Sequence, residues 1–309
     1  MRIECKKCHG ALLTEEHPEF SGFCPECGSP MAGKYSGKAV DEFEILYEIG
    51  RGNNGAVFLA RQLGVGREAA LKLMLREYLS DPAAIAAFFA EARAVACLNH
   101  PNIVQAIAAG RMEDGNFYFA MELIDGPSVE SIIDSSGPLP YREALRIAAL
   151  IARAMASAWN RRGLIHGDIK PANIIMHRGK QPKLADLGLA QFRAVTPREI
   201  MATPLYAPPE VIRADFANMS FASDLYSFGA SVYEMFSGEP PFPGTDIDLV
   251  LKMQLEQAPV TLSEKMGLFN PAVSDFVDQM LAKAAVDRPQ SWDAVADFFA
   301  AACERDAKI

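Results

Sequence analysis

The sequence has no run of roughly 18 uninterrupted apolar residues, which is the length that a membrane-spanning helix needs. It also has no excess of positive charge, because 30 Lys and Arg residues stand against 39 Asp and Glu residues. The net charge of −9 argues against partners such as bulk nucleic acid or an anionic membrane surface. The N-terminus lacks the apolar core of a signal peptide, so we expect a cytoplasmic protein with no membrane span in this chain.

Internal repeats and low-complexity runs are lacking as well, and the composition excludes disorder or a collagen-like repeat for the chain as a whole. Half of the 309 residues are hydrophobic and 22% are charged, which supports a well-buried core. This length predicts two ordinary domains, or one large bilobed domain with room for a small accessory module.

Cysteine is scarce and unevenly placed, since four of the six cysteines lie within the first 27 residues. They form two C-x2-C pairs separated by 15 residues, at Cys5, Cys8, Cys24 and Cys27. In a cytosolic chain this spacing favours zinc over the alternatives, two disulfides or spare thiols. Four thiolates close a tetrahedral shell, so the Zn²⁺ is expected to be structural.

The cysteine pattern resembles the zinc-ribbon family over about residues 3–30, and we assign residues 1–30 to such a module and 31–42 to a linker. The balanced charge of residues 1–40 gives no electrostatic reason for nucleic-acid binding. The two later cysteines, Cys97 and Cys303, lie in apolar helical contexts, and we expect both to be small core residues.

The rest of the chain alternates first at the period of strands and then at the period of helices. The predicted strands are residues 43–50, 56–61, 68–75, 103–111 and 117–123. A helix is predicted from Pro82 to about Leu98, with Asp81 as its N-cap. The later predicted helices are residues 141–162, 222–237, 246–256, 272–283 and 291–305. We therefore expect two lobes, the first mostly strand and the second mainly helical.

A glycine-rich pattern, G-x-G-x-x-G-x-V, begins at Gly50 and includes Gly52, Gly55 and Val57. A dinucleotide-binding fold would need a helix directly after these glycines, but the sequence continues as a strand. The glycines therefore predict a hairpin turn that lets backbone approach phosphates closely. This loop resembles the glycine-rich loop of protein kinases.

Further motifs of the protein kinases follow in the expected order. Lys72 ends the A-A-L-K of the third strand and matches V-A-I-K, and Glu91 lies 19 residues later on the predicted helix. Residues 98–104 resemble the L-x-H-P-N-I-V join after that helix, and residues 165–173 match H-R-D-x-K-x-x-N. Residues 184–188 match the D-F-G motif with Leu in place of Phe.

The second half of the chain continues the series. Residues 201–210 resemble the end of an activation segment, and residues 224–229 and 287–289 match two motifs of the C-lobe. The sequence thus resembles the protein-kinase superfamily over about residues 43–305, most closely the bacterial eukaryotic-like Ser/Thr protein kinases. The resemblance implies an α+β, bilobal kinase fold, with a five-stranded N-lobe and one main helix at about 43–123 and a mainly helical C-lobe at about 126–305.

The resemblance also implies a role for each matched residue in phosphoryl transfer. Lys72 would hold the α- and β-phosphates of ATP, and Glu91 would orient Lys72. Asp186 and Asn173 would ligate Mg²⁺ or Mn²⁺, which prefer hard oxygen ligands. Asp168 would accept the proton of the substrate hydroxyl.

The matched positions for adenine binding come from both lobes. Glu122 and Ile124 would contribute their backbones. The side chains that would surround the ring are those of Val57, Ala70, Met121, as the gatekeeper, and Ile175.

Three further matched residues complete the resemblance. Asp224 resembles the residue that anchors the catalytic-loop backbone, and Glu210 with Arg288 resembles a structural ion pair. Each is expected to belong to the scaffold and not to the chemistry.

Serine and threonine specificity is implied by Lys170, which would also steady the transferring phosphoryl group, and by Thr203. Ala172 replaces a Glu that binds a basic substrate residue in some family members, which makes a strongly basic consensus doubtful. The predicted function is ATP- and Mg-dependent transfer of the γ-phosphate to Ser and Thr hydroxyls of protein substrates, with autophosphorylation. Three roles stay open for the zinc ribbon: docking of partners, regulation through the helix that carries Glu91, or neither.

Two alternative functions stay open at this point. One is a pseudokinase scaffold that binds ATP, although the Lys and both Asp residues it would usually lack are present. The other is a small-molecule kinase of the same fold, which the sequence H-G-D around Gly167 also resembles. Because most regulated kinases have Arg at this position to bind an activating phosphate, Gly167 leads to the hypothesis that activity needs no such phosphate.

Overall fold

The computed structural model describes residues 2–4, 11–13, 37–51, 55–186, 204–215 and 218–306. The N-terminal strands β1 (Arg2–Glu4) and β2 (Ala11–Leu13) pair antiparallel. The four cysteines of the predicted zinc site lie outside the described residues, as do Gly52 and Thr203. The chain forms two compact units, Met1–Ala96 with Gln105–Leu123, and Cys97–Val104 with Ile124–Ile309.

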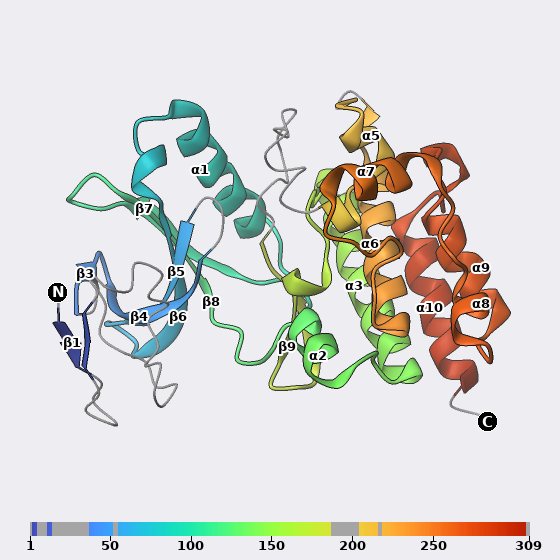
Figure 1. The fold of residues 1–309 in the computed structure, drawn as a ribbon. Helices are drawn as coiled ribbons and strands as arrows, with labels where there is room; N and C mark the ends of the chain where they lie inside the picture. The colour runs from blue at the N-terminus through green and yellow to red at the C-terminus, as the bar shows by residue number, and fades with distance from the viewer. Residues whose placement is uncertain are drawn as a thin grey trace. The chain divides into compact units, whose positions relative to one another are not determined.

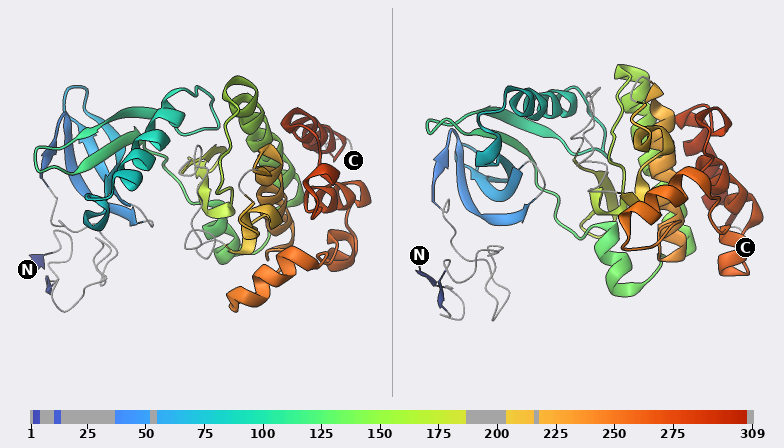
Figure 2. Two further views of the ribbon diagram at one scale, coloured as in Figure 1. Left: turned by 90° about the horizontal axis from the view of Figure 1, so that it is seen from above. Right: turned by 45° about the horizontal axis from the view of Figure 1, so that its top comes forward.

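The first unit is built on a sheet of six antiparallel strands in the order β3-β4-β5-β6-β8-β7, which curls strongly (Figures 1 and 2). Its strands are β3 (Ala39–Val40), β4 (Phe43–Arg51), β5 (Gly55–Gln62), β6 (Arg67–Met74), β7 (Ala106–Arg111) and β8 (Phe117–Glu122). The five longer strands confirm the sequence expectation, and the prediction of only five strands was wrong. The extra strand, β3, lies in the segment predicted as linker and pairs with Phe43 and Glu44.

The extra strand is held on the sheet by side chains as well as by its ladder. Lys38 Nζ lies 2.5 Å from Asp114 Oδ2, and the hydroxyl of Tyr118 donates to Asp41 Oδ2. Asp41 turns the chain between β3 and β4 with a φ of 48°. A two-residue strand beside a tight turn has no periodicity that a sequence pattern could detect.

One face of the first sheet packs into a core of its own. Alternate residues of β5 and β6, among them Phe58, Ala60, Leu71 and Leu73, are buried in that core. The helix α1 (Pro82–Ala96) packs against β7 and β8. As predicted, Asp81 caps it, because its Oδ1 accepts from the backbone N–H of Ala83 at 2.8 Å.

The second unit is mainly helical (Figure 1). Its α-helices in the described ranges are α2 (Val129–Ser136), α3 (Tyr141–Arg162), α5 (Pro209–Ile212), α6 (Phe221–Ser237), α7 (Ile247–Glu256), α8 (Leu262–Met266), α9 (Pro271–Met280) and α10 (Trp292–Asp306). The five longest confirm the sequence expectation. No helix in these ranges combines the length and apolar character that crossing a bilayer requires.

The core of the second unit is organised around α3 and α6, whose inner side chains are fully buried. The helix α10 packs along α3, and the pairs Arg153–Asp297 and Asn160–Asp293 link their surfaces. A two-stranded hairpin, β9 (Ile174–His177) with β10 (Gln181–Leu184), lies against α2 and α3. The polar residues that the sequence singles out flank this hairpin, with Asp168, Lys170 and Asn173 before it and Asp186 after it.

The segment 97–104 belongs to the second unit, although it precedes two strands of the first. Ile103 forms a parallel bridge with Leu184, and Asn102 Nδ2 donates to the Pro182 carbonyl at 2.7 Å. Cys97 lies one residue beyond the end of α1 and is exposed, so the prediction that it is a core residue was wrong. Cys303 is half-buried and packs against the core of the second unit without being part of it, so that prediction is confirmed only in part.

Candidate active site

The first polar cluster is an ion pair in the first unit between Lys72 on β6 and Glu91 on α1. Lys72 Nζ lies 2.9 Å and 3.0 Å from the two carboxylate oxygens of Glu91. Only 8% of Lys72 and 7% of Glu91 are exposed. A pair this well buried must be well made, because either charge left alone there would be strongly destabilising. The structure thus brings together two residues that the sequence places 19 positions apart.

The register of the sheet places the expected adenine-binding side chains of this unit on the same face as Lys72. Lys72 is opposite Val57 on β5, and Ala70 is opposite Met121 on β8. Side chains two apart on a strand and directly opposite on its neighbour share a face. Glu122 ends β8, and its backbone N–H donates to the Gln105 carbonyl at 2.8 Å.

The described glycines of the glycine-rich pattern lie on β4 and β5, and β5 is paired with β6, the strand of Lys72. Gly50 is exposed near the end of β4, and Gly55 begins β5. A Cβ at Gly55 would lie 2.8 Å from the Leu73 carbonyl oxygen and 3.1 Å from Cγ of Lys72. Any larger residue would therefore push the lysine or its strand aside, which explains why the pattern needs glycine at this position.

The second polar cluster lies entirely in the second unit, on the loop before β9. Lys170 Nζ lies 2.8 Å from Asp168 Oδ2, and Asn173 Nδ2 donates to the same oxygen at 3.0 Å and to the Asp168 carbonyl at 2.7 Å. The side chains of Asp168 and Lys170 remain about a quarter and a fifth exposed. The carboxylate of Asp168 is thus fixed in position by two donors and still reaches solvent.

The backbone of this loop is held by hydrogen bonds to Asp224 on α6. Its two carboxylate oxygens accept from the N–H groups of His166 and Gly167 at 2.7 Å and 2.8 Å. Burial raises the pKa of Asp224 to about 7, and the two N–H donors act against that rise. The expectation that Asp224 anchors this loop is confirmed.

His166 is fully buried and links the loop of Asp168 to Ala185, which follows β10. Its Nδ1 accepts from the backbone N–H of Asp168 at 3.2 Å, and its Nε2 lies 3.1 Å from the Ala185 carbonyl. This arrangement needs the neutral tautomer with the proton on Nε2. Burial lowers the pKa of His166, which favours the same neutral form.

Two oxygen-bearing side chains at this site, those of Asn173 and Asp186, are suited to binding a divalent cation. Because Asn173 uses its Nδ2 for Asp168, its amide oxygen faces the other way. The backbone carbonyl of Asn173 also accepts from the N–H of Ala185, and Ala185 directly precedes Asp186 in the sequence. This hydrogen bond holds Asn173 and Asp186 close to each other. Asp186 is exposed and has a φ of 55°, a strained value of the kind that collects at functional sites. A carboxylate and an amide oxygen are ligands that Mg²⁺ accepts.

The remaining expected adenine contacts belong to the second unit. Ile175 is half-buried on β9, opposite Lys183 on β10, and forms a bridge with Ser128. Ile124 precedes this unit's first helix and is also half-buried.

An ion pair deeper in the second unit supports the site. Arg288 Nη1 and Nη2 lie 2.8 Å and 2.9 Å from the two carboxylate oxygens of Glu210, and 1% of Arg288 is exposed. Burial raises the pKa of Glu210, but the hydrogen bonds and charge of Arg288 outweigh it and hold that pKa below its usual value. The expected structural pair is confirmed.

Sequence reasoning missed the side chains that tie residues 204–206 to α6. Ser227 Oγ donates to the Tyr206 carbonyl at 2.9 Å, and the hydroxyl of Tyr206 donates to Glu234 at 2.6 Å. Ser227 and Ser231 are small polar residues four apart in the part of α6, residues 225–233, that has no charged side chain. That spacing is a signal that could have been used.

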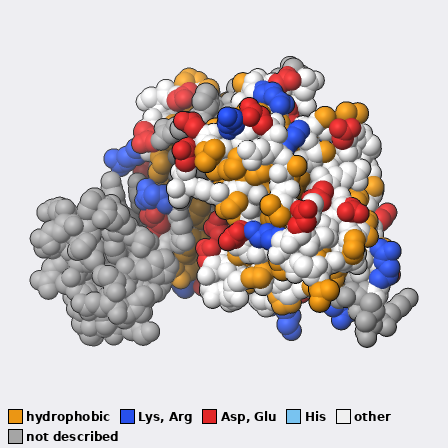
Figure 3. Space-filling view, turned by 45° about the vertical axis from the view of Figure 1, so that its right-hand side comes forward, with side chains coloured by type: hydrophobic (Ala, Val, Ile, Leu, Met, Phe, Trp, Pro, Cys, Tyr) orange, Lys and Arg blue, Asp and Glu red, His pale blue; other side chains and the backbone are white. Residues whose placement is uncertain are grey.

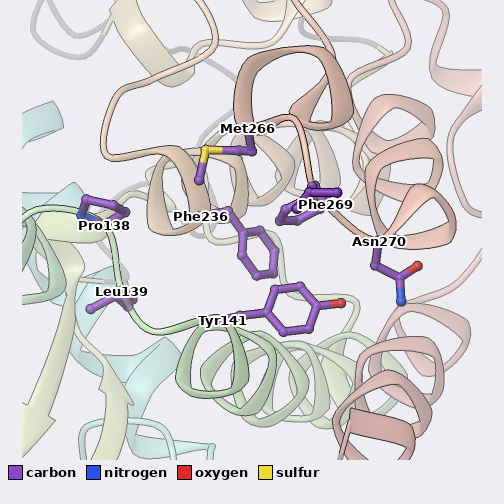
Figure 4. Close-up of a pocket in the computed structure, with 8 residues that line it drawn as sticks. Pro138, Leu139, Tyr141, Phe236, Met266, Phe269 and Asn270 are labelled. Carbon is purple, nitrogen blue, oxygen red and sulfur yellow. The ribbon is translucent and has the colours of Figure 1, made fainter. Parts of the chain in front are cut away.

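A separate apolar pocket of about 370 Å³ lies where α3 begins, α6 ends and α8 connects to α9 (Figure 4). Its walls include Leu139, Tyr141, Phe236, Met266 and Phe269. None of the polar residues above lines it. On the face shown in Figure 3, acidic and basic side chains of the described residues are interspersed.

Comparison with known proteins assigns a family to most of the chain. The model of the protein kinase domain family matches residues 43–299. Serine/threonine-protein kinase PknB of Mycolicibacterium smegmatis is 32% identical over 260 residues, which cover 81% of this chain and 41% of PknB. Serine/threonine-protein kinase PrkC of Bacillus subtilis is 32% identical over 267 residues, which cover 85% of this chain and 39% of PrkC.

The chain therefore spans about two fifths of the length of these curated relatives. Among solved structures, the PknI kinase domain of Mycobacterium tuberculosis matches with a TM-score of 0.68 and 26% identity. That match covers 90% of this chain and 100% of the PknI domain. The curled sheet with one main helix and the helical unit are thus the two lobes of this fold.

Proposed function

The chain belongs to the protein kinase domain family, and from this premise we propose that it transfers the γ-phosphate of ATP to Ser and Thr hydroxyls of proteins. The observation that carries the proposal is the fixed, solvent-accessible carboxylate of Asp168, held by Lys170 and Asn173. Related proteins of similar sequence are named serine/threonine-protein kinases. Autophosphorylation is part of the proposal.

The chemistry divides between positioning and charge neutralisation. Asp168 accepts a hydrogen bond from the substrate hydroxyl and takes its proton as the hydroxyl oxygen attacks the γ-phosphorus. Lys170, already 2.8 Å from Asp168, offsets the negative charge that gathers on the transferring group. Glu91 holds the ammonium of Lys72 in place for the α- and β-phosphates.

Mg²⁺ bound with ATP would neutralise phosphate charge at the site. Asn173, through its amide oxygen, and Asp186, through its carboxylate, are the residues proposed to hold the ion. The backbones of Glu122 and Ile124 are proposed to meet the adenine edge. The proposed contacts with the ring are Val57, Ala70, Met121 and Ile175.

The test is transfer of labelled γ-phosphate from Mg-ATP by the purified chain, alone and with a generic Ser/Thr protein substrate. We expect label on Ser or Thr that disappears in Asp168→Asn and Asp186→Asn variants. Folded wild-type protein that binds ATP but transfers no label would favour the scaffold function. Transfer to a small-molecule acceptor and not to protein would favour the small-molecule kinase.

We further propose that residues 1–30 form a zinc ribbon with Cys5, Cys8, Cys24 and Cys27 as ligands, joined by a linker to the kinase domain at 43–305. The spacing of the cysteines supports this module, and its expected roles are docking of partners or regulation. Purified full chain should contain about one zinc per molecule by elemental analysis. A Cys5→Ser/Cys8→Ser variant that kept the full zinc content would refute the ligand set.

A further inference from the structure

The helix α7 contains one fully buried polar side chain, Gln254, with 0% exposure. Its neighbours Lys252 and Glu256 are exposed. A primary amide has two donor hydrogens and an acceptor oxygen, and burying it without partners is costly. Gln254 should therefore be bound at both ends, and its partners show what it does.

The donor end of Gln254 holds the backbone of Pro204 and Leu205. Nε2 donates to the Leu205 carbonyl at 2.7 Å and lies 3.3 Å from the Pro204 carbonyl. These two carbonyls belong to the 3-10 turn η3 (Pro204–Tyr206). Since carbonyls only accept, the amide cannot turn over without setting oxygen against oxygen.

The acceptor end of Gln254 is fixed by a second buried group. The hydroxyl of Tyr226 donates to Gln254 Oε1 at 2.5 Å, and Lys283 Nζ donates to that hydroxyl at 2.9 Å. The ammonium of Lys283 also lies over the rings of Tyr226 and Phe242, 5.3 Å and 4.6 Å from their centroids. An ammonium group can only donate hydrogen bonds, so the direction of donation is the same along the whole series. Lys283 donates to Tyr226, Tyr226 donates to Gln254, and Gln254 donates to η3.

The turn η3 is bound to the same helix as the loop that carries Asp168. On α6, Asp224 holds the N–H groups of His166 and Gly167, and Ser227, less than one turn later, donates to the Tyr206 carbonyl. The spacing of these two anchors fixes η3 beside the loop of Asp168. A polypeptide that presents a hydroxyl to Asp168 must therefore pass close to η3.

We propose that Gln254 is a positioning residue for the acceptor polypeptide, because it holds the Pro204 and Leu205 carbonyls of η3 in the conformation against which the acceptor lies. This inference rests on the proposed protein kinase function. It assigns the hydrogen-bonded side chains of Lys283, Tyr226 and Gln254 to recognition of the protein acceptor and not to binding of ATP.

The experiment compares steady-state kinetics of the full chain and a Gln254→Met variant, which keeps the side-chain volume and removes the amide. We expect the KM for the protein acceptor to rise about tenfold, as loss of the bonds to η3 predicts, with the KM for ATP unchanged. Gln257→Ala is the matched control, since Gln257 is exposed directly after the same helix. That control should keep both KM values.

A second variant protects the test against misfolding. Tyr226→Phe removes only the hydroxyl that orients Gln254, and we expect a smaller rise in the acceptor KM alone. An unchanged acceptor KM in both variants, or an equal loss for ATP and acceptor, would overturn the inference. A wild-type chain without any transfer to protein would instead refute the proposed function, so the two failures are distinguishable.

Discussion

Lys72 and Glu91 form a two-point ion pair in which one ammonium nitrogen contacts both carboxylate oxygens, at 2.9 Å and 3.0 Å. The pair joins the middle of β6 to α1, so a strand and a helix of the first unit are held at one position. Both residues are more than nine-tenths buried. In the proposed mechanism the same contact presents Lys72 to the phosphates of ATP. Activity therefore depends on the charge of Lys72, whereas stability depends on the pairing of the two buried charges.

The first prediction separates these two dependences. Lys72→Met should lower the rate of phosphoryl transfer by about 100-fold or more, because the positive charge positioned for the phosphates is lost. It should also destabilise the fold by about 3–5 kcal/mol, because Glu91 stays buried without its partner. Transfer of labelled phosphate and urea unfolding measure the two effects.

The control for this prediction is the double variant Lys72→Met/Glu91→Gln. It should recover much of the lost stability, since no buried charge remains, and should recover no activity. Recovery of transfer in the double variant would show that the lysine is not needed for the chemistry.

The second prediction concerns Arg288, which is bound bidentately to Glu210 and also donates to the Ala222 and Ala282 carbonyls. Arg288→Lys keeps the charge but cannot reproduce the planar fork of the guanidinium. We expect a loss of about 3 kcal/mol or more in the free energy of unfolding, as for a broken buried pair. The exposed pair Arg153–Asp297 is the matched control, and Arg153→Lys should change stability little. Similar losses in both variants would contradict the prediction.

Much of the fold could be predicted where a segment is long and strictly periodic. The range predicted for α3, residues 141–162, agrees with the structure, and the strands of the first sheet were placed within a few residues. The short elements were missed, among them β3, the hairpin β9–β10, the eight-residue α2, α5 and α8. A strand of two to four residues carries too little pattern to separate it from a loop.

The site was predictable as a set of motifs but not as a network. Resemblance identified Asp224 and the Glu210–Arg288 pair, whose partners are 57 to 78 positions apart in the chain. It did not identify Gln254, because a glutamine on an amphipathic helix looks like any surface residue until its partners are known. Long-range polar pairing depends on the packing of several helices, and no local spacing encodes it.

The third prediction uses the pH dependence of stability at Glu234. Burial raises the pKa of Glu234 to about 7, and Glu130 and Asp134 add to the rise, while the bond from Tyr206 lowers it. Between pH 4.5 and 7 the folded protein keeps a proton that the unfolded chain has lost. The free energy of unfolding should therefore fall across this window as pH rises, and the penalty is complete above it.

A Glu234→Gln variant removes this titration and can still accept from the Tyr206 hydroxyl. Relative to wild type, its stability should rise by on the order of 2 kcal/mol between pH 4.5 and pH 7 and then stay level. Urea unfolding of both proteins at pH 5 and pH 8 measures the difference, in which other titrating groups cancel. A difference that does not change with pH would contradict the assignment.

The last prediction concerns Gly167, whose φ of 80° lies in the left-handed region and whose N–H is bound to Asp224. A residue with a side chain would be strained there, and glycine offers no guanidinium to bind a phosphate. We therefore expect phosphatase-treated protein, verified by mass spectrometry, to keep transferring phosphate within about twofold of the untreated rate, since no charge-assisted contact at this position is lost. Thr196 lies in the sequence between the D-F-G match at residues 184–188 and the segment 201–210, which makes it a candidate phosphate acceptor, and Thr196→Ala should behave in the same way. The hypothesis fails if the dephosphorylated protein is inactive and regains activity on phosphorylation. A positively charged side chain at another position would then bind the activating phosphate.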